Sequence, residues 1–481
     1  MNECDVLILG AGMSGLCMAA QLKRAGRTGF AVLEQSPGLG GTWWDNRYPG
    51  AHVDVPAPLY SFSFAPNPKW TRRFAAAPEI QAYMQDVAAR EGLAPHLHFG
   101  VRVTRAVFDE ATARWRVETA DGSVWSARHF VCSTGPLSRP RLPAIAGIGS
   151  FAGRVLHSAR WDAGFDAAGQ RIGVIGTGST ASQLIPPLAE GAAQLTVFQR
   201  TANWVLPRLD RPYGTLDRTL ARLPPYAAAV RAFWYAVLEW GRRGFDDGSV
   251  ARRGMHRTAE ALLRRQVPDA ALRAKLRPPY PLGCKRLIYS NDYYRALVRP
   301  NVALVTDAIA RITPAGVVTA DGRAHALDVL VCATGFDVEH SMAHVDIVGR
   351  GGRRLADAWR DGAEAHRGLT VPGFPNLFLM LGPNTATGHT STLLYIEPGV
   401  AWVLRALREA EHRGAATVEV RADAARAYND RLQARLKDSV WSTCRSWYRA
   451  DSGRNIALWP GFTREYVRAL QRCRFEDYAF A

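Results

Sequence analysis

The chain has 481 residues, and its contents of 47% hydrophobic and 21% charged residues are ordinary for a globular protein. This length exceeds one compact core, so two or three domains are expected. The net charge is +17, but the basic residues are scattered without a basic tail or a run of about five. The charge therefore argues against nucleic-acid binding and for solvated surface, with some Arg serving anionic cofactors.

The cysteines are the next constraint. None has the spacing of a CxxC redox pair or of a Cys/His zinc site, so no metal site is predicted. Their odd number and wide scatter favour reduced thiols in a cytoplasmic protein. A glycine-rich motif already begins at Gly10, and no run of about 18 apolar residues occurs, so neither a signal peptide nor membrane insertion is expected. The seven residues are Cys4, Cys17, Cys132, Cys284, Cys332, Cys444 and Cys473.

A strand–turn–helix unit opens the chain. Asp5–Leu9 predicts a buried parallel strand, GAGMSG follows at Gly10–Gly15, and Leu16–Ala25 predicts a helix. The glycines allow the tight turn, the approach of a pyrophosphate and close helix packing, while the helix N-terminus faces the anion. A second strand, Phe30–Leu33, ends in Glu34, which is placed to hydrogen-bond a ribose hydroxyl. The unit predicts a bound dinucleotide, held by Gly10, Gly12, Gly15 and Glu34.

A stretch dense in glycine and aromatic residues follows. Two adjacent glycines in GGTWWDNRYPG, Gly40–Gly50, let the backbone come close to the bound cofactor. On composition alone, Trp43 and Trp44 are core residues and Asp54 is a turn or cap residue. The rest of the first domain is predicted as one amphipathic helix and three strands, over Pro78–Glu91, Val101–Phe108, Trp115–Thr119 and His129–Gly135.

The same unit then occurs a second time. Arg171–Ile175 predicts a strand, GTGSTA the phosphate turn at Gly176–Ala181, and Thr196–Phe198 the next strand. Where the first copy ends in Glu34, the second has Arg200 at the same spacing, and an arginine attracts a 2′-phosphate. This predicts FAD on the first copy and NADPH on the second. The contacts expected to NADPH come from Gly176, Gly178, Ser179, Thr180, Arg200 and Thr201.

The later segments are expected to build an insertion and return the chain to the first domain. Tyr226–Arg242 has the pattern of an amphipathic helix. A helical insertion covering the active site is the favoured interpretation, and a role at a membrane surface is the alternative. Leu327–Phe336 predicts a strand that returns the chain to the FAD domain. Phe374–Asn384 predicts the last buried strand, and a helix is expected over Ser391–Arg408.

Three longer motifs carry a family resemblance. GGTWWDNRYPGAHVD ends at Asp54, FAGRVLHSARWD spans Phe151–Asp162, and PLGCKRLIYSNDYYRALVRPNV spans Pro281–Val302. In this order, with the two glycine-rich turns, they resemble the fingerprints of the type I Baeyer–Villiger monooxygenases. The resemblance covers nearly the whole chain. The linker pattern Phe-x-Gly-x-x-x-His-x-x-x-Trp-Asp and the GGTW stretch are its specific parts.

The resemblance implies roles for several residues. Arg286 lies at the flavin as the catalytic arginine, Asp54 partners it, and Lys285 lies near the phosphate of the nicotinamide nucleotide. His157 belongs to a linker that couples domain movement to the cofactor site, and a role as a base is the weaker alternative. The expected flavin contacts are Gly41, Thr42, Trp43, Asp54, Tyr60 and Asn384. The expected linker residues are Phe151, Gly153, His157, Trp161 and Asp162.

The implied chemistry is oxygen insertion. NADPH reduces FAD, the reduced flavin forms a C4a-peroxide with O2, and the peroxide attacks a ketone to give an ester or lactone. Because a guanidinium stays charged, Arg286 suits both the peroxyflavin and the tetrahedral oxyanion. Asp54 would hold Arg286 and moderate its charge. The partners are thus a small ketone and O2.

The expected fold class is α/β, with two Rossmann-like dinucleotide-binding domains and a helical insertion. The expected segments are 1–143 (FAD domain, first part), 144–206 (NADPH domain, first part, with the linker at 151–162), 207–275 (insertion), 276–324 (NADPH domain, second part) and 325–481 (FAD domain, second part, and tail).

Other interpretations stay open at this stage. A flavin-containing N- or S-monooxygenase shares both nucleotide motifs but differs in the linker. A disulfide reductase needs a thiol pair, and a non-enzymatic cofactor-binding protein has no need for Arg286 with Asp54. GPNTATGHTS at Gly382–Ser391 departs from the Gly-Pro-Gly-Ser form of the family, so the preferred ketone is undetermined. Selectivity and oligomeric state are equally open.

Overall fold

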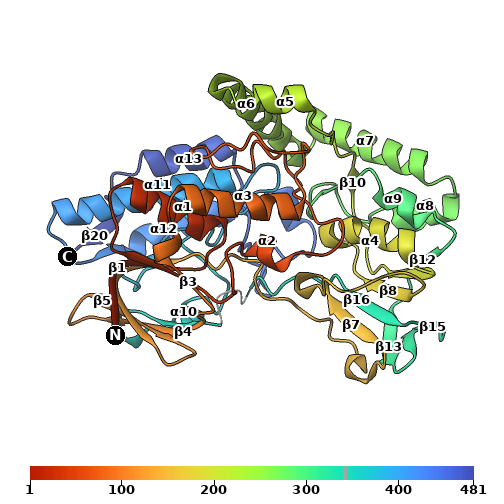
Figure 1. Cartoon of the computed structure of the whole chain (residues 1–481), viewed down its shortest axis with the longest axis horizontal. Helices are drawn as coiled ribbons and strands as arrows, with labels where there is room; N and C mark the ends of the chain where they lie inside the picture. Colours follow the sequence, from red (N-terminus) through yellow and green to blue (C-terminus); the bar gives the residue numbers. More distant parts are fainter. Residues whose placement is uncertain (340–343) are drawn as a thin grey trace.

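The computed structural model describes residues 1–339 and 344–481, which form two α/β units and a helical insertion (Figure 1). In the first unit, β1 (Asn2–Leu9) lies between β2 (Phe30–Glu34) and β6 (Val124–Cys132) and is parallel to both. The sheet has eight strands in the order β17-β4-β5-β6-β1-β2-β3, with β18 beside β6. The others are β3 (Leu97–Phe99), β4 (Val103–Asp109), β5 (Arg114–Thr119), β17 (Asp346–Val348) and β18 (Leu377–Leu379).

Helices cover this sheet. Helix α1 packs on β1 and β2 and contacts α3 and α11, because its apolar residues, such as Leu16 and Leu22, are fully buried against the strands. β19 (Val418–Val420) and β20 (Tyr478–Phe480) pair near the C-terminus. The helices of this unit are α1 (Met13–Arg24), α2 (Thr42–Asp45), α3 (Ala77–Arg90), α10 (Leu355–Ala358), α11 (Leu393–His412), α12 (Ala422–Lys437) and α13 (Thr463–Gln471).

The second unit is built on a parallel sheet in the order β12-β9-β8-β16-β7. Its strands are β7 (Arg154–His157), β8 (Arg171–Ile175), β9 (Gln194–Phe198), β12 (Val302–Val305) and β16 (Val329–Cys332). Two smaller sheets contain β10 (Val205–Leu206) with β11 (Ile288–Tyr289), and β13 (Ile309–Thr313), β14 (Gly316–Thr319) and β15 (Ala324–Ala326). Its helices are α4 (Ser179–Gly191) and α9 (Tyr293–Leu297).

Two expectations from sequence need correction. The strand expected to return the chain to the FAD domain is β16, and it lies between β8 and β7 in the second sheet. The boundary expected between residues 324 and 325 is therefore too early, and β17 is the first strand back in the first sheet. The linker motif also contains a strand, β7, at the edge of the second sheet. Alternating burial cannot identify the placement of β16, because all four of its residues are apolar and buried.

The insertion contains α5 (Thr215–Leu220), α6 (Pro224–Gly241), α7 (Val250–Gln266) and α8 (Ala270–Leu276), of which α5, α6 and α7 lie along the top of the molecule in Figure 1. These helices begin and end close to the bounds of the expected segment 207–275, and α8 ends one residue beyond it. The predicted helix over Tyr226–Arg242 is α6, shifted by two residues at its start. Within the described ranges, no helix combines the length and apolarity needed to cross a membrane.

Candidate active site

The first phosphate turn is shaped for close backbone contacts. Gly10 has φ +100°, and a Cβ placed on it would lie 2.8 Å from the Ser133 carbonyl oxygen. A Cβ on Gly15 would lie 1.9 Å from the Gly10 oxygen. Helix α1 follows an N-cap, Gly12, without a side-chain cap, and no acidic residue lies in its first turn. Its N-terminal N–H groups are therefore available to an anion.

Glu34 ties this turn to the end of β2. Its buried carboxylate accepts a hydrogen bond from the Ala11 N–H (2.8 Å) and one from the Ser36 N–H (2.8 Å). A carboxylate has about four lone-pair sites, so both oxygens keep capacity for a ribose hydroxyl. The predicted position at the strand end is confirmed.

The GGTWWD stretch lies directly against the turn. Gly41 has φ +52°, and a Cβ on it would be 2.9 Å from the Gly12 Cα, so only glycine permits this approach. Thr42 begins α2 and is exposed, whereas Trp43 is buried. Trp43 donates from Nε1 to the Tyr60 hydroxyl (3.0 Å), and their rings meet edge to face. Trp43 and Tyr60 thus form a packed aromatic pair in the segment that follows the turn.

Arg286 and Asp54 form an ion pair between the two units. The Asp54 Oδ2 accepts hydrogen bonds from Arg286 Nη2 (2.6 Å) and Nε (3.2 Å). Arg286 Nη1 donates to the Thr387 carbonyl oxygen (2.8 Å). Both side chains remain partly accessible, at 29% and 28%. The predicted pairing of residues 232 positions apart is therefore present.

The surroundings keep Arg286 charged. Burial works against its charge, but the Asp54 carboxylate outweighs burial and raises the pKa of Arg286 above its ordinary value. Tyr289 and Tyr448 also lie within electrostatic reach of the guanidinium. Burial raises the pKa of Tyr448 to about 12, so its hydroxyl stays neutral at physiological pH. The site is thus a fixed cation with one carboxylate and neutral phenols.

A disulfide lies next to this pair. Cys284 and Cys444 are bonded, although they are 160 residues apart, and the bond fastens the loop carrying Arg286 to the C-terminal tail. The expectation of reduced thiols throughout is wrong for these two residues. Spacing rules detect local pairs, whereas this pair forms only because the fold brings the tail over the site. The other five cysteines are free thiols.

A second layer of hydrogen bonds joins the Thr387 loop to the insertion. His389 Nδ1 lies 3.2 Å from the Thr387 hydroxyl, and its Nε2 lies 3.3 Å from Oε2 of Glu239 in α6. Glu239 also accepts from two N–H groups at the start of α13 (3.0 Å each). Burial works to raise the pKa of Glu239, but these hydrogen bonds outweigh it and lower that pKa. The loop that holds Arg286 is therefore braced by α6.

The second phosphate turn repeats the first. Gly176 has φ +118°, and a Cβ on it would lie 2.4 Å from the Ala333 carbonyl oxygen. Space is open beside Gly178, and Ser179 starts α4 without a side-chain cap. Thr180 follows within the first turn of α4, which leaves another N-terminus available to an anion.

Two cations gather near that turn. Arg200 is exposed after β9, and no acidic partner of it occurs in the described ranges. Burial and then the charge of Arg200 lower the pKa of Lys285, whose ammonium lies 4.7 Å from the centre of the Tyr280 ring. Because a phosphate would offset the repulsion between these two cations, the pair is suited to bind one phosphate between them. Thr201 lies beside them, and its carbonyl accepts from Thr177 (2.9 Å).

The linker motif lies where the two units connect. The chain crosses between them twice, and these crossings pair through Arg141 N–H to the Gly335 carbonyl (3.0 Å). Burial lowers the pKa of His157, and carbonyls of both crossings lie close to its ring. His157 therefore lies beside the two segments that cross between the units, and it is not among the residues contacting Arg286.

The other linker residues fix the path of the motif. A Cβ on Gly153 would lie 2.3 Å from the Asp328 carbonyl oxygen and would strike the buried Phe151 ring. Asp162 pairs with Arg154 of β7, and Trp161 packs edge to face on a neighbouring phenyl ring. Arg160, between them, pairs with Asp45 of α2 (2.8 Å), which links the motif to the GGTW stretch.

Asn384 has a different setting from the one expected. Its Nδ2 donates to the carbonyls of Asn455 (2.8 Å) and Leu458 (3.2 Å), so the side chain anchors the C-terminal tail. Its buried Oδ1 has no partner among the described residues. A flavin contact through this oxygen stays a prediction.

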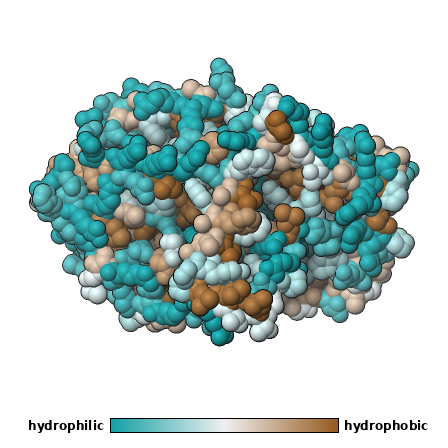
Figure 2. Space-filling model, turned by 90° about the horizontal axis from the view of Figure 1, so that it is seen from above, coloured by the Kyte–Doolittle hydropathy of each residue, from teal (hydrophilic) through white to brown (hydrophobic). Residues whose placement is uncertain are grey.

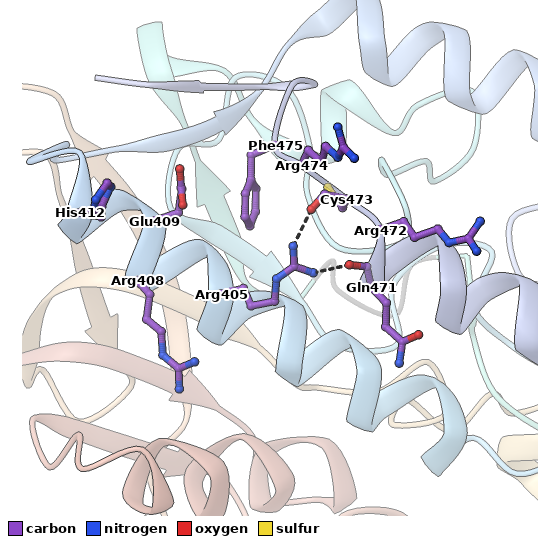
Figure 3. Close-up of a pocket in the computed structure, with 9 residues that line it drawn as sticks. All are labelled: Arg405, Arg408, Glu409, His412, Gln471, Arg472, Cys473, Arg474 and Phe475. Atoms are coloured by element: carbon purple, nitrogen blue, oxygen red, sulfur yellow. Dashed lines mark hydrogen bonds between the residues drawn. The ribbon is translucent and has the colours of Figure 1, made fainter.

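A large cavity lies elsewhere. It measures about 950 Å³ and opens between the end of α11 and the turn after α13 (Figure 3). Arg405 points across it and donates to the carbonyls of Gln471 (3.0 Å) and Cys473 (2.6 Å). None of the predicted site residues lines it, so this basic cleft is not the site built around Arg286.

Comparisons with family profiles and relatives agree with this geometry. A profile described as NAD(P)-binding Rossmann-like domain matches residues 8–77, and one described as L-lysine 6-monooxygenase/L-ornithine 5-monooxygenase matches residues 54–211. A protein of Streptomyces coelicolor named Baeyer-Villiger monooxygenase is 42% identical, over 98% of this chain and 92% of that protein. One of the same name from Pseudomonas aeruginosa is 39% identical, over 100% and 91%.

Solved structures show the same likeness. Oxidized steroid monooxygenase bound to NADP superposes with a TM-score of 0.90 at 33% identity, covering 100% of this chain and 99% of that one. Closed cyclohexanone monooxygenase gives 0.90 at 28% identity over 100% and 99%. The complex of OTEMO with FAD and NADP gives 0.91 at 28% identity, over 99% of each chain.

Proposed function

The chain belongs to the Baeyer–Villiger monooxygenase family, and on that premise we propose that the Arg286–Asp54 pair carries its oxygenation chemistry. The enzyme depends on FAD and NADPH and inserts one oxygen atom of O2 next to a ketone carbonyl, which gives an ester or lactone. The observation that carries the proposal is the guanidinium held by Asp54 and Thr387 between two phosphate turns.

The residues of the first unit fit FAD. The uncapped start of α1 offers N–H groups to the pyrophosphate, and the missing side chains at Gly10 and Gly41 leave the backbone approachable. Glu34 is placed to accept from a ribose hydroxyl, and Trp43 with Tyr60 lines the flavin side. When bound and reduced by NADPH, FAD activates O2 for the reaction.

The residues of the second unit fit NADPH. Gly176, Gly178 and the start of α4 receive the pyrophosphate, and Ser179 and Thr180 add hydroxyl donors there. Arg200 and Lys285 bind the 2′-phosphate, a role that favours NADPH over NADH. We assign to Thr201, which follows Arg200, a contact on the same side of the nucleotide.

Arg286 acts on the anions of the reaction. Its guanidinium remains charged throughout, so it stabilises negative charge on the attacking oxygen and then on the tetrahedral oxyanion derived from the ketone. Asp54 fixes the orientation of the guanidinium and offsets part of its charge. Removing a preorganised donor of this kind costs on the order of 100- to 1000-fold in rate.

The linker motif contributes through its place between the two units and not through chemistry of its own. His157 lies beside both crossings between the units, and Arg160 joins the motif to α2. We assign to Phe151, Gly153, His157, Trp161 and Asp162 the transmission of movement between the units. This role needs no proton transfer, and the low pKa of His157 is consistent with a neutral ring.

The experiment that tests the function is product analysis. Purified enzyme with FAD, NADPH and O2 is given cyclic, linear and aryl ketones beside amines and sulfides. Esters or lactones from at least one ketone, absent without NADPH, support the proposal. Oxidation of amines or sulfides alone, with every ketone recovered, contradicts it and favours the N- or S-monooxygenase alternative.

We also propose a cytoplasmic location, which the need for NADPH favours. The Cys284–Cys444 disulfide bears on this proposal, because a reducing cytosol usually keeps thiols reduced. Recovery of the enzyme in the cytosolic fraction of gently lysed cells supports a cytoplasmic enzyme. A disulfide found in every molecule, together with protein recovered outside the cytosol, contradicts it.

A further inference from the structure

Helix α6 of the insertion has its polar residues on the inside. Arg231 Nη1 donates to the carbonyls of Pro58 (3.0 Å) and Ser61 (2.7 Å) in the first unit. Glu239 is buried against His389 and the start of α13. The side of α6 that packs on the protein therefore holds both charged residues of the helix beside apolar ones such as Leu238, and the solvent side carries no charged residue.

The opposite side of α6 is apolar and uncovered. Tyr226, Phe233, Val237 and Trp240 follow the helical repeat and share one side, which we call the outer face. Phe233 is 59% exposed and Trp240 61%. Figure 2 looks onto the side of the molecule where α5 and α6 lie and shows hydrophobic residues gathered near the middle of that view.

The exposed large hydrophobic side chains are concentrated in the insertion. Eight of the 15 exposed large hydrophobic side chains in the described part of the chain fall between residues 209 and 250. Single exposed apolar residues are normal, whereas a contiguous patch marks an interaction site. The eight are Leu209, Leu216, Leu223, Tyr226, Phe233, Val237, Trp240 and Val250.

Arginines flank α6 in the sequence. Arg218 and Arg222 precede α6 and Arg243 follows it, and all three are exposed. No acidic partner of any of them occurs within the described residues. Residues 207–275 hold 14 Arg and Lys against seven Asp and Glu. The patch is thus an apolar stripe with free guanidinium groups at both ends.

We propose that the outer face of α6 binds the surface of an anionic lipid bilayer. Tyr, Trp and Phe on one side of a helix, flanked by arginines, match the interface between acyl chains and headgroups. A second copy of this chain is a poor occupant, because pairing two such faces brings together like charges of two molecules that each carry +17. The contact is peripheral, since no described helix can cross the membrane, and it does not depend on the reaction.

The test is co-sedimentation of the full-length enzyme, with FAD bound, with vesicles. One set contains phosphatidylcholine alone and the other phosphatidylcholine with phosphatidylglycerol. We expect the wild type to bind the anionic vesicles at low salt and to dissociate at high salt. The double variant Phe233→Ser/Trp240→Ser should lose ~10-fold or more of the bound fraction, and Arg222→Gln/Arg243→Gln should lose selectivity for the anionic lipid.

The matched control is Phe99→Ser, because Phe99 is also exposed, at 39%, but lies in β3. It should bind as the wild type does, and all variants should keep FAD and oxidise NADPH at the wild-type rate. Absence of wild-type binding at low salt overturns the proposal, as does equal loss in the Phe99 variant. A dimer in analytical ultracentrifugation that Phe233→Ser/Trp240→Ser abolishes also overturns it, and assigns the face to a second copy.

Discussion

The phosphate turns of the two nucleotide units are alike, and the residue that ends the strand after the turn differs. Both place a glycine of positive φ against the carbonyl that follows a neighbouring strand, Gly10 against Ser133 after β6 and Gly176 against Ala333 after β16. At the end of the next strand, the first unit has the buried carboxylate of Glu34 and the second has the exposed guanidinium of Arg200. In the function proposed above, the shared turn binds a pyrophosphate, and the residue that ends the next strand selects which dinucleotide binds.

The largest effect is expected from Gly10→Ala. The new methyl group would lie 2.8 Å from the Ser133 oxygen at φ +100°, so the turn must move away from its present path. The purified variant should lack FAD, measured by flavin absorbance, and should be inactive. Gly26→Ala is the control, because it has φ +76° but open space around it. Equal flavin loss in both variants would refute the role of the close contact.

Gly176→Ala should impair the use of NADPH in the second unit without affecting FAD binding in the first. Its methyl group would lie 2.4 Å from the Ala333 oxygen. Strain and overlap together should lower kcat/KM for NADPH on the order of 100-fold, while FAD stays bound. Stopped-flow reduction of the flavin gives the rate, and Gly169→Ala, at φ +69° in open space, is the control. Release of FAD from Gly176→Ala would show that the units are not independent.

Arg200→Gln should weaken the choice between NADPH and NADH. Loss of a charge-assisted contact to the 2′-phosphate lowers kcat/KM for NADPH by ~10- to 100-fold and leaves NADH nearly unchanged. Arg200→Lys should keep part of the preference. Equal losses with both nucleotides would place Arg200 elsewhere than at the 2′-phosphate.

Acid should also weaken the first unit. Burial lowers the pKa of His129 to about 3 and of His52 to about 4, from 6.5 in the unfolded chain. Because the unfolded chain takes up these protons first, stability is complete above about pH 6.5 and falls toward pH 4, by ~1.4 kcal/mol for each pH unit and group.

The measurement is the melting temperature between pH 7 and pH 4, with FAD release followed in parallel. His129→Gln should flatten the dependence on pH, because Gln takes up no proton. A melting temperature that stays constant between pH 6.5 and pH 4.5 would contradict the assignment of neutral buried histidines.

Local patterns predicted much of this protein. Glycine turns, the closing residues Glu34 and Arg200, and the pairing of Asp54 with Arg286 all follow from short motifs. Sequence reasoning missed contacts made over long separations. These are the Cys284–Cys444 disulfide, the position of Tyr448 near Arg286, and the carbonyl of Thr387.

The placement of β16 was missed for a related reason. A fully buried parallel strand is apolar on both faces, so its residues do not show which of two sheets receives it. The site of Asn384 shows the same limit, because the tail loop that its amide holds lies about 70 residues further along the chain. Such positions depend on the assembled fold.

The most direct test of the central claim compares two steps in Arg286→Ala. Anaerobic reduction of the flavin by NADPH should stay within about threefold of the wild-type rate, since we assign the binding of the nucleotide to Arg200 and Lys285 and not to Arg286. Ester formation in air should fall on the order of 100- to 1000-fold, and Arg286→Lys should recover part of it. Ester formation at the wild-type rate in Arg286→Ala would contradict the account.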